Sequence, residues 1–228
     1  MTRWLLLASS LLLLVPAGCD DKNKDRDESD DESDEETKEE KGKAKEGKAK
    51  DEGKPKVFLD CSEAKGGGYL TSAKTAQAKS SIGAIARGAA AAYEREYASA
   101  EQPDEVSTHR LCKSATPVPA AGPPKGTKYE PKSDGTDYET GDEQTGWRCL
   151  KFAMTQPHYF QVGYNAGSGY KSTELGLPDP GPDGFEAWAM GDLDGDGRPS
   201  LYVRTGKVDK EAQRLKLSPV MSCVDPFE

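Results

Sequence analysis

A long charged tract limits folding to the later part of this 228-residue chain. Between residues 20 and 56 almost every side chain is polar: an acidic block over residues 25–36 passes into a run of Lys, Glu, Gly and Ala. So little apolar surface cannot offset the conformational entropy lost on folding. We therefore expect residues 19–56 to form a disordered linker and residues 57–228 to form one globular domain of ordinary size.

Residues 1–18 have the layout of a bacterial signal peptide. Arg3 supplies a positive start, an apolar run spans residues 4–15, and small residues precede Cys19. The run is shorter than the ~20 apolar residues that a transmembrane helix needs. Because charged residues begin directly after Cys19, we expect a lipidated cysteine that holds the chain in the cell envelope, facing the periplasm or the surface. A lipobox usually has leucine where Pro16 stands, so ordinary cleavage after Ala17 is the alternative.

The cysteine count agrees with lipidation. Five cysteines are an odd number for an exported protein, and removing Cys19 leaves four that can form two disulfides in an oxidising compartment. These four are Cys61, Cys112, Cys149 and Cys223. Counting alone leaves three pairings open. Sulfur or imidazole ligation of a metal is disfavoured, because no pair has CxxC spacing and neither His109 nor His158 falls in a ligand pattern.

Charge and motifs disfavour two classes of function. The formal net charge is −9 and the chain has no basic stripe, so we expect no nucleic-acid partner. Neither a GxSxG nor an HExxH motif occurs. His109 lies in a polar connecting stretch and His158 at the start of an expected strand, where a lone histidine is typically a surface or packing residue. We therefore expect a protein that is not an enzyme.

The globular part should begin with a helix and continue as a sheet. Over residues 71–97, apolar or small side chains recur every three or four positions, which predicts a helix with one buried face. Residues 115–126 and 131–146 are rich in Pro, Gly or polar side chains and are expected to be loops. Short runs of aromatic and β-branched residues predict four antiparallel strands, at residues 147–154, 158–165, 185–190 and 201–208. Residues 215–217 are a further candidate for an edge strand.

An acidic, glycine-rich turn separates the last two of these four strands. Three aspartates alternate along it and glycine follows, as in the first half of a calcium-binding loop. The candidate ligand positions for Ca²⁺ are Asp192, Asp194, Asp196, Arg198 and Ser200. The twelfth position is Val203, where an EF-hand has a bidentate glutamate, so we expect modest affinity. The alternative is an acidic hairpin turn that binds no ion.

Four aromatic residues near glycines, Tyr159, Phe160, Tyr164 and Tyr170, allow two interpretations. They either form an exposed face that binds a glycan or another envelope protein, or they fill the core side of the sheet.

Several runs of the domain resemble the globular domain of bacterial type IV pilin-like (fimbrial) proteins. They are IGAIAR with AAYERE (82–87, 91–96), VP (118–119), PKGTKY (124–129), GWRCLKF (146–152), QPHYF (156–160) and AMGDLDGDG (189–197). The resemblance covers residues 71–208. It implies an α+β fold, the pilin-like roll, in which one N-terminal helix packs on an antiparallel sheet of about four strands. It also implies disulfides Cys112–Cys149 and Cys61–Cys223.

The N-terminus departs from a pilin, because a lipoprotein signal and a charged linker replace the prepilin leader and the long apolar assembly helix. We therefore expect a pilin-like domain displayed on a lipid anchor. Its expected role is structural, adhesive or accessory to pili or secretion, with envelope or pilus proteins as partners. The alternative is an envelope module that binds calcium, a glycan or a protein and is unrelated to pili.

Overall fold

The computed structural model describes residues 54–95 and 109–228. The predicted signal peptide, the lipidation site Cys19 and the linker up to residue 53 lie outside the described residues. The last two residues of the predicted helix 71–97 also lie outside them. Among the residues that are described, no helix is both long enough and apolar enough to cross a membrane.

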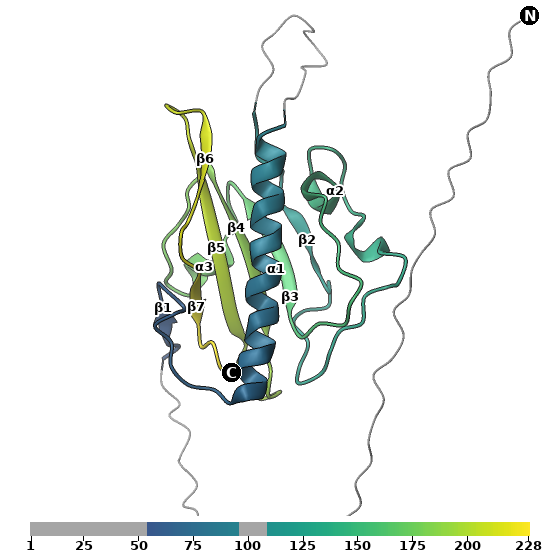
Figure 1. Ribbon diagram of the computed structural model, residues 1–228, viewed down its shortest axis with the longest axis vertical. Coiled ribbons are helices and arrows are strands. Elements are labelled where there is room, and N and C mark those ends of the chain that lie inside the picture. The colour runs from purple at the N-terminus through teal and green to yellow at the C-terminus, as the bar shows by residue number, and fades with distance from the viewer. Residues whose placement is uncertain (1–53, 96–108) are drawn as a thin grey trace, which may run out of the picture. The chain divides into compact units, whose positions relative to one another are not determined.

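The longest helix, α1 (Tyr69–Tyr93), crosses one face of the sheet opposite β4 and β5 (Figure 1). Its buried face carries apolar or small residues three or four positions apart, such as Ala78, Ile82 and Ile85, each fully buried. Gly88 permits a close approach to the next helix: a Cβ atom there would lie 2.6 Å from the carbonyl oxygen of Leu150. This packing is what stabilises the helix, because its first turn has neither an acidic residue nor a side-chain cap.

Within the described residues the sheet has seven strands, all paired antiparallel. The strands are β1 (Val57–Phe58), β2 (Ala115–Val118), β3 (Gln161–Ala166), β4 (Gly184–Gly191), β5 (Ser200–Asp209), β6 (Arg214–Leu217) and β7 (Ser222–Val224). Their order is β1-β7-β5-β4-β3-β2, and β6 pairs with β5 off this path. Three short helical segments lie in the connections: η1 (Thr136–Tyr138), α2 (Gly146–Leu150) and α3 (Lys171–Glu174).

The expected fold class, one N-terminal helix on about four strands in a pilin-like roll, is wrong. The described sheet has seven strands, and four of them, β1, β2, β6 and β7, have only two to four residues. Such short strands carry too few residues to show an alternating pattern. The sequence of β2 also contains Pro117, which favours a loop assignment, although an edge strand tolerates proline.

One of the four predicted strands is not a strand. The segment 147–154 contributes the single helical turn of α2 and a following loop. Trp147 and Leu150, which suggested a strand, are instead buried on the α1 side of the sheet, and the half-buried Phe152 and Met154 pack against the same cluster. Tertiary packing therefore overrides the local β propensity here.

The sheet is covered on both faces. The larger apolar cluster lies on the α1 side and includes Phe160, Tyr164, Phe185 and Tyr202. A smaller cluster centres on Trp188. Its other buried members are Leu177, Leu201, Val203 and Val224. Gly163, the register partner of Trp188, has no Cβ, and one placed there would lie 2.2 Å from the indole ring. Burial on both faces explains why β4 is nearly continuous in apolar residues and does not alternate.

Two disulfides connect distant parts of the domain. Cys61, just after β1, is bonded to Cys223 in β7, and Cys112 is bonded to Cys149 in α2. These are the same two pairs that the pilin resemblance implies.

Candidate functional site

The acidic turn forms the connection between β4 and β5. Asp192 lies directly after β4 and is only 2% exposed. Its carboxylate accepts hydrogen bonds from the backbone N–H groups of Gly195, at 2.7 Å, and Gly197, at 3.0 Å. Both glycines have positive φ angles, 81° and 93°. The turn therefore curls around the Asp192 side chain, and the glycines give it the backbone conformations it needs.

The other two aspartates extend the same pattern toward solvent. Asp194 accepts a hydrogen bond from the N–H of Asp196, at 3.2 Å, and Asp196 accepts one from the N–H of Arg198, at 2.9 Å. One oxygen from each of the three aspartates lies within 4.8 Å of the others. Oxygens that share one Ca²⁺ ion at about 2.3–2.6 Å can be at most about 5 Å apart. The cluster of Asp192, Asp194 and Asp196 thus has a geometry that can hold a metal ion.

A second segment holds the turn in place. The backbone of Asp192 forms two hydrogen bonds with the loop at residues 124–126: Gly126 donates to its carbonyl at 2.7 Å, and its own N–H donates to Pro124 at 3.3 Å. The Lys74 ammonium donates to the carbonyl of Leu193 at 3.4 Å. The carboxylates therefore sit on a hairpin supported from two sides, which limits the rearrangement needed to bind an ion.

The remaining predicted ligand positions lie at the end of the turn. Ser200 is buried at the start of β5, and its hydroxyl donates to the carbonyl of Gly191 at 2.9 Å, closing the base of the hairpin. Arg198 is half-buried. Val203 packs in the core cluster around Trp188, so the twelfth position of the loop supplies no oxygen side chain.

Both histidines are held by backbone carbonyls. His158 is 1% exposed, with Nδ1 at 2.6 Å from the carbonyl oxygen of Phe160 and Nε2 at 3.2 Å from the Tyr138 hydroxyl. Burial lowers the pKa of this imidazole, against the hydrogen bond to Phe160, which raises it. A neutral ring that donates through Nδ1 and accepts through Nε2 satisfies both contacts. His109 contacts the carbonyl of Tyr93 through Nδ1 at 2.9 Å.

Three of the four aromatic candidates for a binding face belong to the core. Phe160, Tyr164 and Tyr170 are at most 5% exposed. Tyr159 alone is half-buried, and the ammonium groups of Lys74 and Lys128 lie 4.5 and 5.2 Å from the centroid of its ring.

Sequence reasoning missed one buried acid. Glu186 on β4 is fully buried and accepts hydrogen bonds from the N–H of Lys171 at 2.5 Å, the N–H of Ser172 at 3.2 Å and the Ser172 hydroxyl at 2.5 Å. Burial raises the pKa of its carboxyl, against these hydrogen bonds, which lower it. Its position between Phe185 and Ala187 in an apolar strand was the available signal. The contacts tie the α3 segment to the sheet.

Comparison with protein-family models, with curated proteins and with solved structures found no match to this chain. The chain is assigned to no family. The function must therefore be inferred from the residues themselves.

Proposed function

We propose that this chain is a non-enzymatic lipoprotein of the bacterial cell envelope, and that Ca²⁺ stabilises its globular domain at the β4–β5 turn. The main support for the calcium site is that one carboxylate oxygen from each of Asp192, Asp194 and Asp196 lies within 4.8 Å of the other two. Carboxylate oxygens are the ligands that Ca²⁺ prefers. The two disulfides are typical of an oxidising compartment, which agrees with export.

The ion would act structurally. Three carboxylates close together repel one another, and a divalent cation removes that repulsion while joining both ends of the turn. Because the turn itself supplies only three carboxylates, we expect an affinity in the range of extracellular calcium modules, with a Kd of about 0.1–1 mM. Backbone carbonyls and water complete the coordination in this proposal.

Calcium titration tests the site. We expect Ca²⁺ at tenfold its Kd to raise the free energy of unfolding by about 1.4 kcal/mol, because it binds only the folded chain. The variant Asp194→Asn/Asp196→Asn should lose this gain, as measured by urea unfolding and by isothermal titration. Asp192 is left intact because it holds the turn.

Glu130→Gln, which removes an exposed carboxylate outside the turn, is the matched control and should retain the full effect. Equal stabilisation of the native chain and the double aspartate variant would contradict the site. So would the absence of any calcium effect on the native chain.

The lipid anchor is tested separately. We expect a radioactive fatty acid to label the native chain in bacterial cells and to leave the Cys19→Ala variant unlabelled. Two or three acyl chains bind a bilayer stably, since each buried CH₂ contributes about 0.8 kcal/mol. An unlabelled native chain whose N-terminus begins after Ala17 would instead show ordinary secretion. The structural, adhesive and pilus-accessory roles remain predictions.

A further inference from the structure

We infer that a groove beside α1 binds a segment of a partner protein that carries apolar side chains and, at one end, an Asp or Glu carboxylate. The α1 groove consists of two hollows of about 430 and 440 Å³ that have Gln77 as a common wall residue. Its residue Lys74 also contacts the acidic turn through the carbonyl of Leu193, but the inference requires neither a bound ion nor a lipid anchor.

The walls of the α1 groove are mainly apolar. Phe152 and Met154, both half-buried, line one hollow opposite Ala84 of α1. Leu70 lines the other hollow and is 73% exposed. Along the first hollow, α1 contributes mostly small side chains, Ser80, Ser81 and Ala84, whereas its longer side chains Leu70 and Lys74 line the second. A partner backbone can therefore approach α1 closely and place apolar side chains in both hollows.

One end of the α1 groove carries two positive charges. Lys74 and Lys128 both line the hollow that contains Leu70. Their ammonium groups lie 4.5 and 5.2 Å from the centroid of the Tyr159 ring. Within residues 54–95 and 109–228, no acidic residue lines either hollow. Among the described residues, neither ammonium has a carboxylate within ion-pair distance. Lys74 donates to the backbone carbonyl of Leu193, but neither ammonium is paired directly with a carboxylate of the described residues, so one ligand carboxylate can pair with both.

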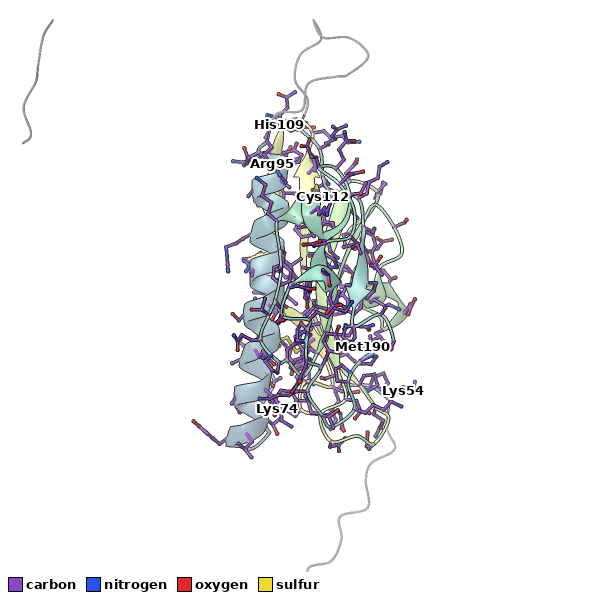
Figure 2. The ribbon with its side chains drawn as sticks, turned by 90° about the vertical axis from the view of Figure 1, so that its right-hand side faces the viewer. Lys54, Lys74, Arg95, His109, Cys112 and Met190 are labelled. Atoms are coloured by element: carbon purple, nitrogen blue, oxygen red, sulfur yellow. A yellow bond between two sulfur atoms is a disulfide. The ribbon has the colours of Figure 1, made fainter. Side chains whose placement is uncertain are left out.

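The positions of the apolar walls and of the two lysines define which partner segment fits the α1 groove. Figure 2 shows Lys74 near the beginning of α1, at the opposite end of the helix from Arg95 and His109. Apolar side chains of the partner would lie along the middle of α1, beside Phe152 and Met154, and its carboxylate would lie at the Lys74 end. The chain's own acidic block, residues 25–36, does not fit this description because it contains no apolar side chain.

Selection from a random peptide library on the Cys19→Ala chain tests the inference. We expect the enriched peptides to share apolar residues with an Asp or Glu at one end of the apolar stretch. Replacing that acid by Asn or Gln should weaken binding roughly tenfold, since the carboxylate contacts two cations. Lys74→Ala/Lys128→Ala should weaken binding by a similar factor, and Met154→Glu should abolish it. Lys65→Ala/Lys207→Ala, which removes two exposed lysines outside the groove, should leave affinity unchanged.

Several results would overturn the inference. They are the failure of any peptide to enrich, enrichment of peptides without acidic residues, and affinity that is the same for the Lys74/Lys128 variant and the native chain. Concentration-dependent dimerisation that Met154→Glu abolishes would also overturn it, by assigning the groove to a second copy of the chain. Unfolding midpoints equal to the native value would show that the variants are folded.

Discussion

Replacing Cys61 and Cys223 together by alanine should lower the free energy of unfolding by up to about 5 kcal/mol, because the disulfide restricts a very long loop in the unfolded chain. The two cysteines are 162 residues apart, so the bond encloses nearly the whole domain. In the fold it fastens the β1 segment, which has only a two-residue strand, to β7. Without it we expect β1 to detach before the rest of the sheet unfolds.

The second disulfide provides the matched control. Cys112 and Cys149 are only 37 residues apart, and the same entropy argument gives about 4 kcal/mol for this loop. Urea unfolding followed by circular dichroism should therefore give a lower free energy of unfolding for the Cys61→Ala/Cys223→Ala variant than for the Cys112→Ala/Cys149→Ala variant. A loss below about 1 kcal/mol for the longer loop would contradict this prediction, as would a free thiol at Cys223 in the native chain.

Trp147→Ala should destabilise the domain by about 3–5 kcal/mol, the range for removing a large buried aromatic side chain. Trp147 is fully buried, and its indole N–H donates to the carbonyl of Thr116 at 2.8 Å. Its ring packs against Tyr138 and Phe152, with centroids 5.3 and 5.5 Å away. The substitution would leave a cavity between α2, β2 and η1, together with a carbonyl that lacks its donor.

Trp147→Phe separates these two contributions. It keeps most of the aromatic contact but loses the hydrogen bond, so we expect a loss of about 1–3 kcal/mol. Circular dichroism is the suitable probe, because the substitution removes a tryptophan and therefore changes the fluorescence of the chain. If Trp147→Ala costs no more than Trp147→Phe, the packing proposed for this ring is wrong.

The parts of the fold that the sequence predicted are those with a strong local pattern. The apolar period over residues 71–97 located α1, and β4 and β5 begin and end within one residue of their predicted limits. The prediction of a strand over residues 147–154 was wrong because the aromatic residues there suit a strand or a buried turn equally well. In the structure, the bond from Cys149 to Cys112 and the packing of Trp147 accompany the helical turn.

The acidic turn could be found from the sequence because its three carboxylates lie within five consecutive residues. Local spacing alone brings such groups together once the glycines allow the turn. The α1 groove could not be found in this way. Tyr159, Lys74 and Lys128 come from three separate segments, and only the packing of α1 beside the loops brings them to one hollow. The same holds for Glu186, whose donors lie 14 and 15 residues before it.

By itself, then, the amino-acid sequence determined the long helix, the two central strands and the acidic turn. In each of these, neighbouring residues carry enough periodicity or conformational preference to specify the structure. The tertiary structure alone decided the short strands β1, β2 and β7 and the charged groove beside α1. These features depend on contacts between residues far apart in the chain, and no local pattern encodes such contacts because their energy appears only when the core is assembled.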